Sequence, residues 1–138
     1  MILRNQTLIL RTDGAARGNP GHAAAGVVIE DSQGKLLARG KKYLGRLTNN
    51  QAEYKALILG LKAVAKYHPA TVRIYMDSEL VVNQINGRYE VRHKDLLPLY
   101  EEARRLAAEL PTASFTHIER AENHLADALA NQALDERK

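Results

Sequence analysis

The spacing of apolar residues in this 138-residue chain changes near residue 48, and that change limits the folds that the chain can adopt. Before it, segments rich in β-forming residues alternate with turns dense in Gly, Asn, Asp and Pro; the segments are 7–12, 26–30 and 35–44. The first segment is expected to end at Asp13-Gly14. Because short connections join antiparallel neighbours, the sequence predicts three antiparallel strands.

After residue 48 the pattern becomes helical and then alternates between strand and helix. Thr48-Asn49-Asn50-Gln51 fits a capping box, in which Thr48 starts the helix and Gln51 bonds back to it. The segments that follow are a helix to Pro69, a strand over 71–76, helices from Ser78 to Asn86 and over 95–110, a strand over 114–119 and a helix over 123–134. A strand, helix, strand series implies a parallel crossover. We therefore expect one α/β domain over 1–138, with a mixed five-stranded sheet (three antiparallel strands, then parallel ones) and the order βββαβααβα.

The amino-acid composition excludes several kinds of site. The chain has no cysteine, which excludes disulfides, thiolate zinc sites and cysteine nucleophiles. Its net charge of +4 favours a polyanionic partner, although many basic proteins bind none. The first residues contain no long apolar run of the secretory kind, and no stretch approaches the roughly 20 apolar residues of a membrane helix. We expect a cytoplasmic monomer with no membrane contact and no obligatory protein partner.

Four acidic residues stand at the ends of predicted strands or the beginnings of predicted helices. Asp13 and Asp77 each close a strand, and α/β sheets bind ligands at the carboxyl ends of their parallel strands. Glu53 lies in a first helical turn, yet apolar residues follow it at +3, +4, +7 and +11, so its side chain should point towards the sheet. Asp127 repeats this placement in the last helix. Taken singly, Glu53 or Asp127 is also explained by a favourable contact with the helix dipole.

Together, the four carboxylates predict a metal site. Carboxylates without cysteine are hard oxygen ligands, which suit Mg²⁺ or Mn²⁺ rather than Zn²⁺. Their four negative charges match two divalent cations, and two such ions ~3.5–4 Å apart can clamp the attacking and leaving oxygens of a phosphoryl displacement. The basic remainder of the surface would hold the polyanion around this acidic centre.

Four motifs occur in order from about Thr7 to Ala133: Thr12-Asp13-Gly14-Ala15 with Gly18-Asn19-Pro20-Gly21, Thr48-Asn49-Asn50-Gln51-Ala52-Glu53, Asp77-Ser78, and Asn123-x-x-Ala126-Asp127. In this order the chain resembles ribonuclease H of the small type 1 class. The resemblance implies the ribonuclease H-like fold and endonucleolytic hydrolysis of the RNA strand of RNA–DNA hybrids, leaving 3′-hydroxyl and 5′-phosphate ends. It further implies two Mg²⁺ ions, replaceable by Mn²⁺, on the catalytic acids Asp13, Glu53, Asp77 and Asp127.

The resemblance also implies substrate contacts. Asn19, Asn49 and Asn50 match positions that contact the minor groove of the hybrid, where only RNA offers a 2′-hydroxyl. Arg46 and Thr48 match positions that hold a phosphate of the DNA strand. Without the resemblance, Asn19 is a turn residue, Thr48 a helix cap and Arg46 a solvated loop charge. The two roles of Thr48 are compatible.

The sequence departs from the family pattern in three places. Glu79 stands where many relatives carry glutamine, and a carboxylate accepts hydrogen bonds but does not donate them, so this substrate contact is altered or lost. The stretch 86–97 is too short for the extra basic helix of some relatives. The Gly- and His-rich loop before the last acid is also absent. Among the residues there, we expect Arg120 and His124 to assist turnover and His117 to have a packing or surface role.

Two other functions are compatible with the same fold. A catalytically silent module that binds hybrids would be expected to have lost at least one of the four acids, and none is missing. An integrase-like DNA nuclease would have little use for the three asparagines that match RNA-reading positions. The sequence therefore favours a ribonuclease H.

Overall fold

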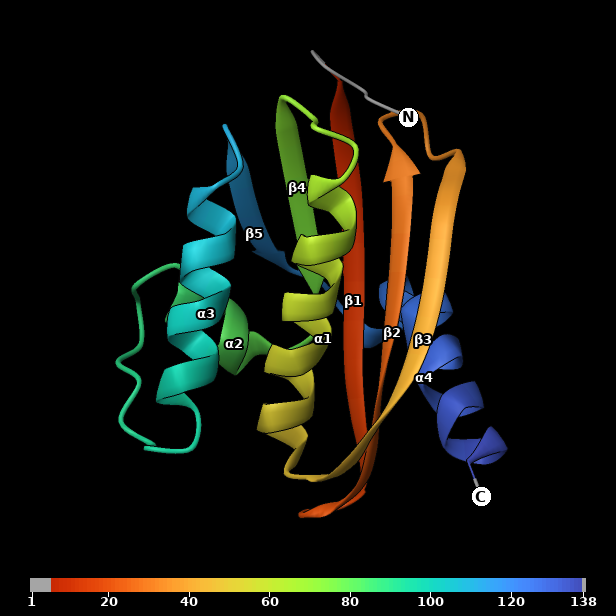
Figure 1. The fold of residues 1–138 in the computed structure, drawn as a ribbon, viewed down its shortest axis with the longest axis vertical. Coiled ribbons are helices and arrows are strands. Elements are labelled where there is room, and N and C mark those ends of the chain that lie inside the picture. The colour runs from red at the N-terminus through yellow and green to blue at the C-terminus, as the bar shows by residue number, and fades with distance from the viewer. Residues whose placement is uncertain (1–5, 138) are drawn as a thin grey trace.

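The computed structural model describes residues 6–137, whose five strands form one sheet in the order β3-β2-β1-β4-β5 (Figure 1). The strands are β1 Thr7–Gly18, β2 Gly21–Asp31, β3 Leu36–Leu47, β4 Thr71–Met76 and β5 Ala113–His117. The helices are α1 Asn49–Ala65, α2 Glu79–Ile85, α3 Leu97–Ala108 and α4 His124–Glu136, with a 3₁₀ turn over Arg120–Asn123 before α4. Strands β1 to β3 pair antiparallel, whereas β4 and β5 run parallel to β1. The predicted fold class and element order are confirmed.

The predicted end of the first strand is wrong. β1 does not stop at Asp13-Gly14 but continues to Gly18, paired residue by residue with β2. The partner strand supplies the backbone hydrogen bonds that keep this Gly- and Ala-rich stretch extended, and local sequence does not reveal that partner. The parallel pairing of β1 with β4, however, ends at Thr12 opposite Met76. Asp13 and Asp77 therefore follow directly on the carboxyl end of the parallel ladder, as the sequence argument requires.

Helices α1, α2 and α3 lie on one side of the sheet and α4 lies on the other (Figure 1). Alternate residues of β2 show this division, because Val27 and Ile29 belong to the main core with α1, whereas Ala24 and Val28 pack against α4. Thr48 caps α1 as predicted: its Oγ1 accepts from the Gln51 N–H at 3.2 Å, and Gln51 Oε1 accepts from the Thr48 N–H at 2.8 Å. This cap fixes the point at which α1 begins over the sheet.

The connection from α2 to α3 contains no helix in the described chain, so the extra basic helix is absent as expected. Its cationic residues Arg88, Arg92, His93 and Lys94 are all exposed. Helix α3 is shorter than predicted by about a turn, with a proline in its first positions. Over residues 6–137, no helix has the length and apolar character needed to cross a membrane.

Two glycines allow the helices to approach the strands closely. A Cβ on Gly14 would lie 2.2 Å from the backbone carbonyl of Ala52 in α1, and a Cβ on Gly26 would lie 2.0 Å from the backbone oxygen of Ala126 in α4. Gly14 follows Asp13 in β1, and Gly26 is the β2 residue paired with Asp13. Since neither place has room for a side chain, α1 and α4 meet the strands backbone to backbone on both sides of Asp13.

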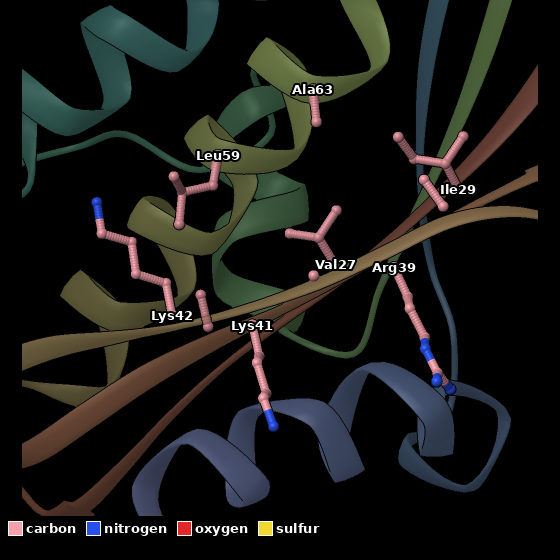
Figure 2. Close-up of a pocket in the computed structure, with 10 residues that line it drawn as sticks. Val27, Ile29, Arg39, Lys41, Lys42, Leu59 and Ala63 are labelled. Atoms are coloured by element: carbon pink, nitrogen blue, oxygen red, sulfur yellow. The ribbon is translucent and has the colours of Figure 1, made fainter. Parts of the chain in front are cut away.

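An apolar hollow of about 270 Å³ lies between the edge strand β3 and helix α1 (Figure 2). Val27 and Ile29 of β2, Leu59 and Ala63 of α1, and Lys42 of β3 are among the residues that line it. The hollow marks where α1 stops covering the sheet, and most of β3 beyond it is exposed. The side chains of β3 therefore contribute little to the core.

We expect alanine at Gly26 of β2 to lower the stability of the protein and alanine at Gly40 of the neighbouring strand β3 not to lower it. Gly26→Ala should lower the free energy of unfolding by roughly 1–3 kcal/mol, because α4 must move away. Gly40→Ala should be neutral or raise it by about 0.5 kcal/mol, since a Cβ there meets nothing within 4 Å. Urea unfolding of both variants and the parent measures the difference. Equal stabilities of the two variants would contradict the close approach of α4 at Gly26.

Candidate metal and nucleic-acid site

Three carboxylates from separate elements meet beyond the last parallel pair of β1 and β4. Asp13 comes from β1, Glu53 from the first turns of α1, and Asp77 from the residue after β4. Each offers one oxygen, and these three oxygens all lie within 4.8 Å of one another. Glu53 follows Ala52, the residue whose backbone contacts Gly14, so the close approach of α1 delivers this side chain to Asp13.

Asp13 and Glu53 are almost completely buried, with exposed fractions of 4% and 5%. Burial, followed by the negative charges of Glu53 and Asp77, raises the pKa of Asp13 to about 10. Burial also raises the pKa of Glu53 to about 8, although the hydrogen bond that Glu53 Oε1 accepts from the Gly14 N–H at 2.9 Å acts in the opposite direction. Such a group of buried like charges is stable only with bound protons or a cation.

The residues present fit a divalent cation of the Mg²⁺ or Mn²⁺ kind. The donors are all carboxylate oxygens, they come from three elements held together by the core, and neither cysteine nor histidine stands among them. A cation at this point would offset both the burial and the repulsion that raise the pKa values of Asp13 and Glu53. The three residues that would share it are Asp13, Glu53 and Asp77.

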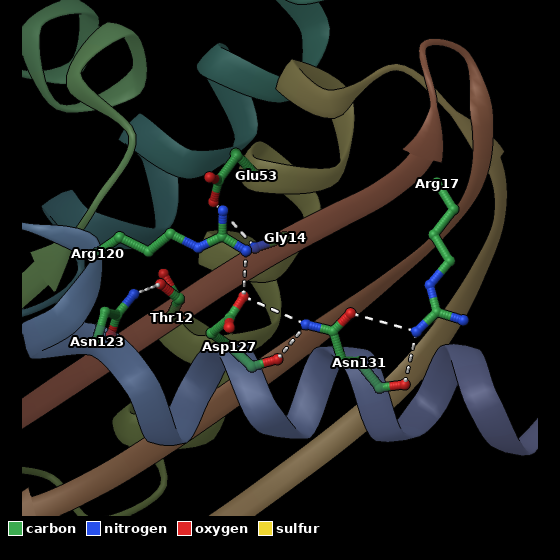
Figure 3. Close-up of polar contacts among 8 residues, drawn as sticks. All are labelled: Thr12, Gly14, Arg17, Glu53, Arg120, Asn123, Asp127 and Asn131. Carbon is green, nitrogen blue, oxygen red and sulfur yellow. Dashed lines mark hydrogen bonds and ion pairs between the residues drawn. The ribbon is translucent and has the colours of Figure 1, made fainter.

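Asp127 approaches the same centre from α4, one residue after the Ala126 backbone that contacts Gly26. It is closer to solvent, with a side chain 26% exposed, and it is near enough to Asp13 to contribute to the raised pKa of that residue. Its Oδ1 lies 3.4 Å from Arg120 Nη2 and 3.3 Å from Asn131 Nδ2 (Figure 3). The buried side chain of Asn123 fastens the start of α4 to β1, donating from Nδ2 to the Thr12 carbonyl at 2.9 Å.

A polar cavity of about 370 Å³ opens over these groups. Its lining residues include all four predicted metal ligands and three cationic or amide side chains that approach them: Asp13, Glu53, Asp77, Asp127, Arg120, Asn49 and Asn131. Arg120 carries the positive charge that favours ionised Glu53 and pairs with Asp127. The arrangement combines an acidic floor for cations with a guanidinium at the rim for a phosphate.

The predicted minor-groove and phosphate residues lie beside this cavity, around the start of α1. Asn19 Oδ1 accepts a hydrogen bond from the Asn49 N–H at 3.0 Å, which ties the β1–β2 turn to the helix. Arg46 stands near the end of β3, opposite His22 of β2, and Thr48 caps α1. Asn50 is in the first turn of the same helix. Of these residues only Asn49 lines the cavity itself.

The remaining predicted residues are placed less centrally. Glu79 and His117 line a separate polar hollow of about 400 Å³ between α2 and β5, together with Arg88. His124 is an exposed first residue of α4 and does not line the metal cavity, whereas Arg120 does. Arg120 is thus the one of the three turnover candidates that contacts a predicted metal ligand within residues 6–137.

Sequence reasoning missed Arg17 and Asn131, which form a polar chain to Asp127 (Figure 3). Arg17 Nη2 donates to Asn131 Oδ1 at 3.3 Å, and Asn131 Nδ2 donates in turn to Asp127. The sequence did contain one signal for Asn131: it lies four residues after Asp127 on a predicted helix, a spacing at which side chains are neighbours. The contribution of Arg17 has no local signal, since it lies 114 residues away in the sequence.

Comparison with known proteins identifies the family. The family model "Reverse transcriptase-like" matches residues 11–133. The chain is 43% identical over 129 residues to "Bifunctional protein Rv2228c" of Mycobacterium tuberculosis, covering 93% of this chain and 35% of that protein. It is 45% identical over 124 residues to "Ribonuclease HI" of Halobacterium salinarum, covering 90% of this chain and 62% of that one. The chain thus spans about a third to three fifths of the length of these relatives.

Comparison with solved structures indicates the same family. The ribonuclease H1 crystal structure from Halobacterium salinarum superimposes with a TM-score of 0.92 at 43% identity, covering 95% of this chain and 99% of that one. LC11-RNase H1 from compost, solved in complex with an RNA/DNA hybrid, gives a TM-score of 0.90 at 40% identity, with coverage of 94% and 97%. With the sheet order, the carboxylate cluster and these likenesses together, the chain belongs to the ribonuclease H family, small type 1 class.

Proposed function

We propose that this chain is a ribonuclease H that hydrolyses the RNA strand of RNA–DNA hybrids with two divalent cations, leaving 3′-hydroxyl and 5′-phosphate ends. The observation that carries the proposal is the meeting of Asp13, Glu53 and Asp77 within 4.8 Å, with Asp127 beside them. A relative at 40% identity is known in complex with an RNA/DNA hybrid, which supports the choice of substrate. The chain acts, in this proposal, as one domain and a cytoplasmic monomer with no obligatory protein partner.

Each carboxylate has a distinct task. Asp13, Glu53 and Asp77 would hold a cation together, and Asp127, which lines the same cavity, would contribute to binding the second. Bound Mg²⁺, or Mn²⁺ in its place, would supply Lewis-acid stabilisation of the phosphate and a water of lowered pKa. Glu53 is held by the Gly14 N–H through Oε1, which leaves Oε2 available as a ligand.

Arg120 and the residues around the start of α1 would hold the hybrid. Asn19 uses its Oδ1 internally, so its Nδ2 remains to donate to the minor groove, with Asn49 and Asn50 beside it. The Thr48 hydroxyl accepts from the Gln51 N–H and keeps its own proton for a phosphate of the DNA strand. Arg46 supplies the positive charge for that phosphate. Glu79, an acceptor, would contact a 2′-hydroxyl or a guanine amino group.

Replacing the metal-binding acids tests the proposal. Asp13→Asn, Glu53→Gln and Asp77→Asn should each abolish cleavage of a labelled RNA–DNA hybrid while hybrid binding, measured by fluorescence anisotropy, survives. Asp127→Asn should be milder, because an amide oxygen still ligates and the other acids hold one cation. Gel analysis of the products, with double-stranded DNA and double-stranded RNA as control substrates, also establishes the cleaved strand and its ends.

Two results of that experiment would contradict the proposal. Full activity of Asp77→Asn would remove the assigned ligand set. Hybrid binding by the parent without any cleavage in Mg²⁺ or Mn²⁺ would identify a silent binding module, and preferential cleavage of double-stranded DNA would identify a DNA nuclease of this fold.

The stability of the protein in EDTA should fall as the pH rises. Unfolded carboxyl groups ionise near pH 4, whereas folded Asp13 and Glu53 hold protons up to about pH 10 and 8. Folding therefore takes up protons, and stability that is present below pH 4 is lost as the pH rises through these values. Asp13→Asn should raise the melting temperature at pH 8, with the gain shrinking towards pH 4.

Glu101→Gln, at an exposed position of α3, is the matched control and should show no such pH-dependent gain. Mg²⁺ should stabilise the parent more than Asp13→Asn at pH 8. A melting temperature difference between Asp13→Asn and the parent that is constant from pH 4 to pH 8 would contradict the assigned cause.

Substitutions of Arg120, His124 and His117 should have different effects on kcat. Arg120→Ala or His124→Ala is expected to lower kcat roughly 10- to 100-fold with a smaller change in KM, because Arg120 pairs with Asp127 and His124 lies one turn before Asp127 on α4. His117→Ala should affect stability at most. Steady-state kinetics on the same hybrid measures this, and slow cleavage by His117→Ala alone would show that the loop before α4 has been assigned wrongly.

A further inference from the structure

Asp127 is held differently from the other three carboxylates. Asp13 and Glu53 are buried by the core, whereas the Asp127 side chain is 26% exposed and stands on a helix outside the tight group of three oxygens. Its position therefore depends on side-chain contacts. Within the described residues, these come from Arg120, Asn131 and Asp13.

Arg120 is a poor permanent anchor for Asp127. Its contact with Asp127 Oδ1 is long, at 3.4 Å, and its side chain is 76% exposed. It is also a cation that lines the cavity, where a phosphate of the substrate would compete for it. An arginine that turns to a phosphate no longer holds the carboxylate.

Asn131 makes a second contact with Asp127, from a side chain that is less exposed than Arg120. Its Nδ2 donates to the Asp127 backbone carbonyl at 3.0 Å and to Asp127 Oδ1 at 3.3 Å, so one amide group grips both parts of the residue. Asn131 and Arg120 both donate to Asp127 Oδ1, and neither of them donates to Asp127 Oδ2. A carboxylate pinned through one oxygen presents the other in a fixed direction.

Arg17 determines which way the Asn131 amide faces. A guanidinium only donates, so the atom that it meets at 3.3 Å must be the Asn131 oxygen, and the Asn131 nitrogen must then face Asp127. Arg17 is itself held by Asp135 at 2.7 Å, one turn further along α4. The chain Arg17–Asn131–Asp127 thus connects β1, which carries Asp13, with the carboxylate on α4 (Figure 3).

We propose that Asn131 is a positioning residue for the fourth carboxylate, oriented by Arg17, and that it sets the affinity of the cation shared by Asp13 and Asp127. The inference rests on the proposed function for the identity of that cation. It does not require Asn131 to touch the substrate. Residues that orient a metal ligand typically contribute 10- to 100-fold to metal affinity or activity.

Mn²⁺ titration of the protein without substrate, followed by electron paramagnetic resonance, tests the inference directly. Asp127→Asn first identifies the Mn²⁺ site to which Asp127 contributes. Asn131→Ala should weaken that same site about tenfold or more and raise the Mg²⁺ concentration for half-maximal hydrolysis, with KM for the hybrid little changed. Asn131→Asp, which cannot donate to Asp127, should lose at least as much, and Arg17→Ala somewhat less.

Gln132→Ala is the matched control, since Gln132 is the next residue of α4 and is exposed. A double-mutant cycle separates positioning from a general structural role: Asn131→Ala should cost almost nothing further in the Asp127→Ala background, where no side-chain oxygen is left to position. Equal Mn²⁺ titrations of Asn131→Ala and Gln132→Ala, or full additivity in the cycle, would overturn the inference. If the parent does not cleave hybrids but the titrations still separate these two variants, the proposed function fails and the positioning role stands.

Discussion

The close approach of two helices to one strand is the constraint on which this site depends. Metal ligands must be placed to within a fraction of an ångström, and rigid elements do this better than loops. Gly14 and Gly26 remove the side chains that would hold α1 and α4 away from Asp13, and the residues next to the two contact points are Glu53 and Asp127. Packing therefore determines the geometry of the carboxylate cluster, and Gly14 and Gly26 bring together acidic side chains that they do not themselves supply.

That geometry has an electrostatic cost. Asp13 and Glu53 are buried beside each other and beside Asp77, which raises their pKa values far above the ordinary range. The large core of leucine, isoleucine and valine side chains under α1 offsets this cost, because the hydrophobic stabilisation of a buried side chain is about 1.5–3 kcal/mol. A cation that binds only the folded protein would raise the free energy of unfolding through mass action and so offset part of this cost. Unfavourable burial of the acids and affinity for a cation are thus two consequences of one arrangement.

Much of the fold followed from local patterns, and the site followed in part. The cap at Thr48 and the apolar face of α1 predicted both the start of the helix and the burial of Glu53, because both signals lie within the helix itself. The extension of β1 beyond Asp13 was missed, since a Gly- and Ala-rich stretch becomes a strand only through pairing with β2. Arg17 and Asn131 were missed for a related reason: their partnership joins segments 114 residues apart. Local propensity does not encode such contacts, although it places the elements that make them.

The same reasoning explains why polar contacts matter most at α4. Helix α1 is anchored by the main core, whereas α4 meets the sheet mainly through small clusters of alanine with Val28, Leu129 and Leu134. Small side chains permit the close approach at Gly26, but each removes little apolar surface from water. Polar contacts then complete the docking at both ends of the helix, from Asn123 to the Thr12 carbonyl, from Arg17 to Asp135 and from Lys41 to Glu136. The fourth carboxylate consequently stands on the helix with the weaker apolar anchorage, and hydrogen bonds provide the positioning that burial in the core provides for Asp13 and Glu53.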